Sequence, residues 1–211
     1  VHSPLYEIEA PYVAEMVRLE IVRRFGAAAQ NEGYKVYTTL DTRLQAAANR
    51  ALRLGLIEYD RRHGWRGAHS RVTLSGKEDE AALNALLDEI PGVGPLTPAV
   101  VTSVQDKAAQ VHVKLRGTAT IGWDGLSWAS RRETDEKTGP EPRHASERLA
   151  RGDIVYVVSA NNIAQLAQLP EAEAALVAID PADGGIAALV GGFDYFDNAL
   201  DLLINARLNS I

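Results

Sequence analysis

The chain has 211 residues, of which 46% are hydrophobic, so it can bury the core of one large domain or of two small ones. The absence of cysteine excludes disulfides and thiolate metal sites. The longest apolar stretches, 174–179 and 186–190, fall far short of the roughly 18 residues that a membrane-spanning helix needs. We therefore expect no membrane contact within this chain.

The net charge of −6 is distributed unevenly along the chain. Residues 1–66 carry 10 basic and 8 acidic side chains, and residues 67–160 carry 11 and 13. Residues 161–211 carry Arg207 alone against seven acidic side chains. Proteins that bind nucleic acid usually present a basic face, because neutralising phosphates supplies most of the non-specific affinity. The charge pattern therefore predicts that nucleic acid is not a partner.

The first third of the chain predicts a helix, a strand and a second helix. Pro11 precedes an apolar pattern of helical spacing over Tyr12–Arg24. The β-branched and aromatic residues of Tyr34–Leu40 predict a short strand. Thr42 and Gln45 have the spacing of a capping box, which predicts that a helix begins there. The polar run 59–67 then predicts a domain boundary.

Residues 67–160 predict a small all-β domain. After a short helix over Glu78–Glu89, four strands are predicted at Ala99–Val104, Ala108–Leu115, Thr118–Trp123 and Asp153–Ser159. The polar segment 131–150 is long enough for either a functional excursion or local disorder. The strand count fits a five-stranded barrel of the oligonucleotide/oligosaccharide-binding (OB) type, and a sandwich fits almost as well.

The last segment predicts a β-hairpin, Ala174–Ile179 and Ile186–Val190, joined by a turn in which Pro181 and Gly184 suit the backbone. Near-continuous apolar strands are typical of a sheet covered on both faces, so we expect further elements to cover this hairpin. The predicted division is therefore 1–66, 67–160 and 161–211. The fold class is α+β.

Two motifs resemble the transpeptidase half of class A penicillin-binding proteins, the bifunctional cell-wall synthases, and most closely the 1A group of Gram-negative bacteria. One is the Tyr-Thr-Thr-Leu-Asp segment of residues 37–41, which opens the transpeptidase domain in that family. The other is the apolar-Asp-Pro-x-x-Gly pattern at Asp180, Pro181 and Gly184, which follows an inserted barrel in the 1A group. Residues 10–13 and 59–67 resemble the linker and the entry into that inserted domain. The resemblance implies an OB-like barrel inserted in a fragment of a serine transpeptidase domain.

The catalytic motifs of that family are missing or misplaced. No serine is followed three residues later by lysine, so the nucleophile motif Ser-x-x-Lys is absent. Lys137-Thr138-Gly139 and Ser159-Ala160-Asn161 match the other two motifs by three residues each, but in the wrong order, and we interpret both as coincidences. Residues 195–211 do not follow the family's continuation past Gly-Gly-Phe-Asp. We predict no catalytic residue and no cofactor in this chain.

Other candidate sites have simpler structural interpretations. His63, His69 and Asp60 have no recognised metal-ligand spacing, and we predict no metal. Asp180 and Asp183 are better explained as turn formers than as paired acid and base. One candidate partner-binding surface remains on the inserted domain, formed by Trp128, Arg131 and Arg132. The nearby Trp123 is better explained as a cap on the barrel core.

The resemblance implies a function for the parent protein rather than for these residues alone. The parent would polymerise and crosslink peptidoglycan from lipid II on the periplasmic side of the inner membrane, as a target of penicillin. Within it, this chain would be a non-catalytic linker and regulatory docking region, with an outer-membrane lipoprotein activator as the partner of the inserted domain. The alternative is an independent OB-type module that binds oligosaccharide or nucleic acid.

Overall fold

The structure, a computed structural model, describes residues 8–26, 29 and 32–195. The described residues up to Gly55, with those from Glu173 onward, form one compact unit. Leu56–Ala172 form a second unit, which we call the barrel unit. The division predicted at residues 66 and 160 stays a prediction, and the unrecognised ending 197–211 lies outside the described residues.

In the first unit, helix α1 spans Pro11–Phe25 and confirms the predicted first helix. Pro11 stands at the first helical position, where its missing N–H costs nothing. Gly26 ends the helix with φ +82°, and its N–H donates to the carbonyl of Val22. Among the described residues of α1 none is buried, and Met16 and Leu19 are half-exposed. The helix therefore presents apolar side chains that the described residues do not cover.

The predicted strand over residues 34–40 is wrong, because this segment has no β-ladder in the described chain. Only its end approaches strand β8, where the hydroxyl of Thr39 donates to the carbonyl of Ile186 at 2.8 Å and the N–H of Asp41 donates to the carbonyl of Ala187 at 3.0 Å. Two such contacts fix the end of the segment without making it a strand. β propensity alone does not supply the hydrogen-bonding partner that a strand needs.

Helix α2 spans Thr42–Arg62 and runs straight through Gly55. Its N-terminal cap differs from the predicted capping box, because Asp41 rather than Thr42 accepts from the N–H groups of residues 43 and 44, at 2.8 and 3.0 Å. These hydrogen bonds lower the pKa of Asp41. Gln45 does not reach back to the cap. Its fully buried amide instead accepts from the N–H of Leu189 at 2.9 Å and donates to the Leu189 carbonyl at 3.0 Å.

The predicted hairpin is confirmed by strands β7, Leu176–Ile179, and β8, Ile186–Val190, which pair antiparallel. Asp180 and Asp183 act as turn formers, because each side chain accepts the N–H two residues further on at 2.8 Å. Val177 and Ile179 of β7 are 52% and 60% exposed. The described residues thus leave apolar side chains of this hairpin open, although the pattern is typical of a covered sheet.

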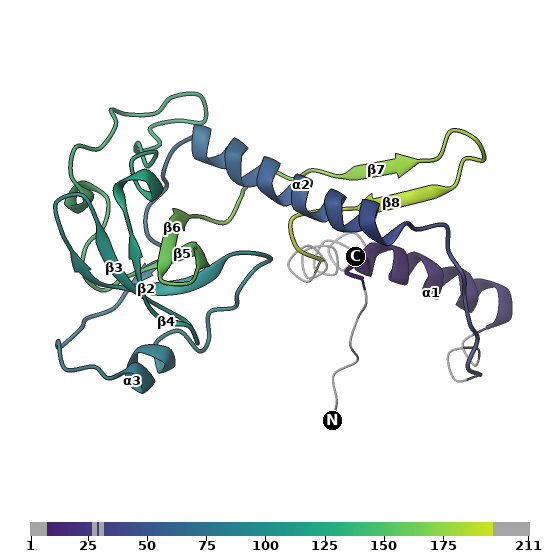
Figure 1. The fold of residues 1–211 in the computed structure, drawn as a ribbon, viewed down its shortest axis with the longest axis horizontal. Coiled ribbons are helices and arrows are strands. Elements are labelled where there is room, and N and C mark those ends of the chain that lie inside the picture. The colour runs from purple at the N-terminus through teal and green to yellow at the C-terminus, as the bar shows by residue number, and fades with distance from the viewer. Residues whose placement is uncertain (1–7, 27–28, 30–31, 196–211) are drawn as a thin grey trace, which may run out of the picture. The chain divides into compact units, whose positions relative to one another are not determined.

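The barrel unit is built from the six remaining strands. They are β1 (Ser70–Arg71), β2 (Thr97–Val104), β3 (Ala109–Val113), β4 (Gly117–Ile121), β5 (Asp153–Ala160) and β6 (Ile163–Ala167). The sheet order is β1-β5-β2-β3-β4-β6, and the additional pairing of β5 with β6 closes a five-stranded barrel (Figure 1). All of its pairs are antiparallel except β4 with β6. The predicted OB-like barrel is confirmed, and the sandwich alternative is wrong.

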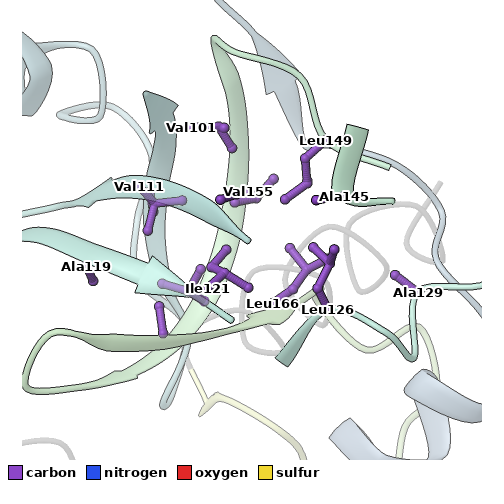
Figure 2. Close-up of a cluster of buried hydrophobic side chains, with 14 of the residues drawn as sticks. Val101, Val111, Ala119, Ile121, Leu126, Ala129, Ala145, Leu149, Val155 and Leu166 are labelled. Atoms are coloured by element: carbon purple, nitrogen blue, oxygen red, sulfur yellow. The ribbon is translucent and has the colours of Figure 1, made fainter. Parts of the chain in front are cut away.

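The barrel is filled by small and branched apolar side chains from strands β2 to β6 and from the 122–152 connection. Figure 2 shows Leu126, Ile121 and Leu166 packed together, with Leu149 and Ala145 entering from the connection. All five are at most 2% exposed. Leu126 follows the short 3-10 helix Trp123–Gly125, and Ala145 begins a second one, Ala145–Glu147. These two short helices, with the residues that follow them, therefore contribute to the barrel core.

A second, smaller core lies against the outer face of β2 and β5. Leu87, Val100 and Ile154 form its centre, beneath helix α3, Glu80–Ala85, which is shorter than the predicted Glu78–Glu89. Asp79 caps α3 by accepting the N–H of Ala82 at 2.8 Å. The segment around α3 therefore covers part of the outside of the barrel.

Candidate functional site

Of the three residues of the predicted partner surface, the structure places Arg131 and Arg132 on one cavity and Trp128 outside its lining. Trp128 is half-buried and packs edge-on against Trp65, with ring centroids 6.0 Å apart. The guanidinium of Arg61 lies over the Trp128 ring, 5.6 Å from its centroid. The indole Nε1 of Trp128 is buried and has no hydrogen-bond partner among the described residues. Trp128 is therefore mainly a packing residue rather than an exposed platform for a partner.

Arg131 and Arg132 differ in how they are held. The guanidinium of Arg132 is paired with Asp135 and Glu171, both at 2.5 Å, and these carboxylates raise the pKa of Arg132. Arg131 is exposed, and within the described chain its guanidinium has no ion pair. Its main-chain carbonyl accepts the N–H of Gly139 at 2.7 Å, which fixes the backbone beneath the side chain.

Arg131 and Arg132 line a cavity of about 320 Å³, which we call the arginine cavity. Its other lining residues are Trp65, Arg66, Gly67, Glu147 and Arg148. The lining therefore includes four arginines and one glutamate. Arg66 and Arg148 were missed from the sequence, because they lie far from residues 131–132 in the chain. Only the clustering of arginine in the boundary segment 59–67 hinted at Arg66.

The arginines of the cavity are anchored by acceptors. Arg66 donates to Asp60 at 2.7 Å, forms an ion pair with Glu171 at 3.1 Å and donates to the carbonyl of Leu169. Asp60 is only 4% exposed, so its charge requires such a partner. Asp60 thus anchors Arg66. Arg132 shares Glu171 with Arg66, so one carboxylate bridges two of the four guanidinium groups.

Arg148 holds the segment 131–150 onto the barrel. It donates to the carbonyls of Ala129 at 2.6 Å, Glu147 at 3.0 Å and Pro140 at 3.1 Å. A second attachment joins His144 to Asp106, and this partner lowers the pKa of Asp106. Of the two interpretations of this segment, the contacts favour a built excursion over local disorder.

Trp123, predicted to cap the barrel core, packs against the core from a partly buried position. Its outer face carries the ammonium of Lys107, 3.9 Å from the ring centroid. Lys107 also donates to the carbonyl of Arg143. The ring face on which a ligand would stack is therefore already covered by a cation of the same unit.

The candidate metal ligands do not converge. The Nδ1 atom of His63 forms a hydrogen bond with the carbonyl of Tyr59 at 2.7 Å, and the imidazole stacks on the Tyr59 ring. His69 instead packs edge-on against Tyr156. Within residues 8–26, 29 and 32–195, no three His, Asp or Glu side chains gather as a metal would require. His2 lies outside the described residues.

The two partial matches to transpeptidase motifs also lie apart from any catalytic arrangement. Lys137 pairs with Glu133 at 2.7 Å in an exposed loop. The hydroxyl of Ser159 accepts from Arg116 at 3.1 Å. A nucleophilic serine needs a general base within hydrogen-bond reach, and a guanidinium cannot take a proton.

The outer face of strands β3 and β4 is the surface on which OB folds bind oligonucleotides and oligosaccharides. Here its cross-strand pairs are Gln110 with Thr120 and His112 with Thr118, none of them aromatic apart from the imidazole. His112 is 2% exposed, and its Nε2 lies 3.1 Å from the side-chain oxygen of Asn84 in α3. The α3 segment therefore occupies one end of this face.

The closed barrel, its sheet order and the short helices that plug it are the features of an OB-like domain. Residues 65–172, just over half of the chain, match the family described as penicillin-binding protein OB-like domain, and the chain belongs to that family. The sequence is similar to penicillin-binding protein 1A of Vibrio cholerae, with 41% identity over 93% of this chain and 25% of the relative. It is 37% identical to penicillin-binding protein 1A of Escherichia coli K12, over 92% of this chain and 23% of the relative.

A solved structure supports the same relationship. The crystal structure of penicillin-binding protein 1A from Haemophilus influenzae aligns with a TM-score of 0.70 and 32% identity, over 94% of this chain and 28% of that one. The chain thus spans about a quarter of the length of the relatives it matches. Among the described helices, none is both long and apolar enough to cross a membrane.

Proposed function

We propose that this chain is a non-catalytic portion of a bifunctional peptidoglycan synthase and serves it as a linker and docking region. The whole protein would combine glycosyltransferase and D,D-transpeptidase activities, use lipid II and peptidoglycan, and act on the periplasmic side of the inner membrane as a target of penicillin. The observation that carries the proposal is the closed OB-like barrel of 65–172, flanked by residues that align with penicillin-binding protein 1A relatives.

The non-catalytic role rests on the absence of the nucleophile motif from all 211 residues and on the contacts of the partial matches. Ser159 faces Arg116 and Lys137 faces Glu133, so neither side chain is placed to activate a nucleophile. The apolar side chains left open on α1 and β7 fit the same proposal, because further parts of a transpeptidase domain would cover them.

The acylation test uses intact-mass spectrometry before and after incubation with a β-lactam. We expect the 211-residue chain to remain at 22.8 kDa without an adduct. A longer protein that contains this chain and the remaining three quarters of the relatives' length should gain one covalent acyl group. Stoichiometric acylation of the 211-residue chain itself would contradict the non-catalytic role.

The proposed docking partner is an outer-membrane lipoprotein activator that contacts the barrel unit. Support comes from the excursion 131–150, which is anchored by Arg148 and by the pairing of Asp106 with His144, and so presents a built surface. We expect the immobilised 211-residue chain to bind the purified lipoprotein reversibly in biolayer interferometry. Binding that requires residues outside this chain would overturn the assignment of docking to the barrel unit.

The alternative, an independent OB-type module, is disfavoured by the outer face of β3 and β4. Single-stranded nucleic acids and oligosaccharides are bound by stacking on aromatic side chains in a suitable groove. In this chain the corresponding face carries Gln110, Thr118 and Thr120 as its exposed residues. Fluorescence anisotropy with labelled oligonucleotides and oligosaccharides should show no saturable binding, and saturable binding lost on substitution of these residues would revive the alternative.

A further inference from the structure

We propose that the arginine cavity binds a carboxylate group presented by an acidic polypeptide segment. The proposal deepens the docking role above and rests on it for the polypeptide nature of the ligand. The chemistry of the cavity itself rests on the four guanidinium groups of Arg66, Arg131, Arg132 and Arg148.

The concentration of arginine at this cavity runs against the charge of the surrounding unit. Leu56–Ala172 carry 14 basic and 16 acidic residues, a net charge of −2. The cavity lining nevertheless holds four arginines against Glu147 alone. Asp60, Asp135 and Glu171 pair with Arg66 and Arg132, so the positive charge left without a carboxylate is that of Arg131, which attracts an anionic group small enough to enter.

Unused hydrogen-bond donors remain at the cavity. A guanidinium has five N–H donors and no acceptor. Arg131 has no side-chain acceptor among the described residues, so its whole fork is available. Arg66 and Arg132 each use part of theirs on Asp60, Asp135, Glu171 and the Leu169 carbonyl, and Arg148 uses part on three carbonyls.

The structure contains an internal precedent for the proposed contact. The carboxylate of Glu171 bridges two guanidinium groups, at 3.1 Å from Arg66 and 2.5 Å from Arg132. This arrangement shows that two arginines of this lining can share one carboxylate. The Glu171 side chain is 59% exposed, so it lies on the solvent side of Arg66 and Arg132.

The lining is also largely pre-organised. The side chains of Arg66, Arg132 and Arg148 are 22%, 19% and 13% exposed and are held by the acceptors named above. Trp65, 4% exposed, supplies an apolar wall and is fixed by main-chain hydrogen bonds to residues 130 and 132. A ligand would therefore have to order chiefly Arg131, which keeps the entropic cost of binding small.

Acidic side chains of the excursion 131–150 disfavour long polyanions. The same excursion carries Glu133, Asp135, Glu136 and Glu141. A nucleic acid or an anionic membrane surface would bring many phosphates against these carboxylates, and like charges repel. A single carboxylate on a flexible polypeptide can enter the cavity while its neighbouring residues avoid them.

The test is an NMR titration of the whole 211-residue chain with the pentapeptide Glu-Gly-Glu-Gly-Glu, blocked at both ends. The matched probe is Gln-Gly-Gln-Gly-Gln. We expect saturable shifts of the Trp65 indole and of the amides of residues 131 and 132 with the glutamate peptide only. The binding should fade at about 1 M salt, where screening reaches within ~3 Å.

The decisive variant is Arg131→Gln, because this side chain has no structural partner to lose. We expect it to weaken binding roughly three- to fivefold, the effect of one exposed charge contact, and Arg131→Lys to restore part of the loss. Arg143→Gln is the matched control, since Arg143 is also an exposed arginine of the same excursion and lies outside the cavity lining. Equal losses in R131Q and R143Q would overturn the proposal.

Two further outcomes are informative. If inorganic phosphate competes more strongly than the glutamate peptide, the cavity is a phosphate site and the carboxylate assignment is wrong. If the lipoprotein binds R131Q as tightly as the original chain, docking stands and the arginine cavity is not its contact. Binding of the glutamate peptide without any lipoprotein binding would support the cavity and refute the proposed activator.

Discussion

The conformation of Gly152 yields the sharpest prediction of stability. Gly152 precedes β5 with φ +88°, its N–H donates to the carbonyl of Val101, and its carbonyl accepts from Val72, both at 2.8 Å. A Cβ added at this position would lie 2.1 Å from the carbonyl oxygen of Val72, where ordinary contact begins at 3.4 Å. Gly152→Ala must therefore displace the backbone of residue 72 by more than an ångström.

The cost of Gly152→Ala has two parts that a control separates. A non-glycine residue at positive φ costs about 1–2 kcal/mol. Displacing Val72 adds about 1 kcal/mol for its lost hydrogen bond and 1–3 kcal/mol for strain, so we expect about 4 kcal/mol in total. Gly67→Ala is the control, because Gly67 has φ +110° and nothing within 4 Å of its added Cβ. It should lose only the conformational part.

Urea unfolding followed by tryptophan fluorescence measures the difference, since all three tryptophans, at 65, 123 and 128, belong to the barrel unit. With a typical slope of 1–3 kcal/mol/M, the midpoints of the two alanine variants should lie roughly 1 M apart. Equal midpoints would refute the steric argument and reduce the role of Gly152 to its φ angle.

Three further predictions concern hydrogen-bonded polar side chains. The side-chain oxygen of Asn84 lies 3.1 Å from Nε2 of His112 and accepts the N–H of Leu115 at 2.8 Å, and Leu115 has φ +58°. Asn84→Ala should therefore lower the free energy of unfolding by about 2 kcal/mol in the same urea assay, and Asn84→Asp should lower it less. Burial lowers the pKa of His112 below 6.5, so below that pH the unfolded chain binds a proton more readily than the folded chain. The contribution of His112 to the free energy of unfolding should therefore be complete above pH 6.5 and decrease below it. Urea unfolding between about pH 5 and 7 should show this dependence, and His112→Gln should flatten it. Gln45→Leu should leave the part-buried N–H of Leu189 without its acceptor and lower the free energy of unfolding by about 1–3 kcal/mol. Hydrogen exchange at the Leu189 amide should become faster, and unchanged exchange would contradict the pairing.

Strands of the barrel could be predicted because their alternation is local. In β3, inward-facing Val111 and Val113 alternate with outward-facing Gln110 and His112, and the period of two marks a strand with one face in the core. The order of the strands depends on how they are connected and on how the barrel closes. The sequence indicates only how many strands there are. The strand count therefore favoured an OB-type barrel only slightly over a sandwich, and the pairing of β4 with β6 decides between them.

The errors arose where a side chain serves a distant element. Thr42 and Gln45 have capping-box spacing, but Gln45 extends the hydrogen bonding of β8 and Asp41 takes over the cap. Tyr34–Leu40 has strand-like composition and no ladder. The contacts of both segments are with β8, where Gln45 pairs with Leu189 and Thr39 with Ile186. These residues are more than a hundred positions away in the sequence, so a local pattern cannot reveal them.

The arginine cavity illustrates the same limit for function. Arg131 and Arg132 were predicted as a surface with Trp128 because they are neighbours in the chain. The fold turns Trp128 toward Trp65 and brings Arg66 and Arg148 to the other two. A site assembled from three separate segments is visible only once the excursion 131–150 has been placed on the barrel.

The way the barrel is closed also explains where a partner can bind. The pairing of β4 with β6 at residues 120–121 and 163–164 closes the barrel, so little strand edge is left there for a partner to extend. The α3 segment and the pair Asn84–His112 occupy one end of the outer β3–β4 face, and Lys107 covers the ring of Trp123. Under the docking proposal, recognition would fall to the excursion, where exposed Arg131 has a backbone held by the N–H of Gly139. Because an OB-like fold does not by itself specify a ligand, it is this loop, rather than the barrel, that should decide which partner the protein accepts.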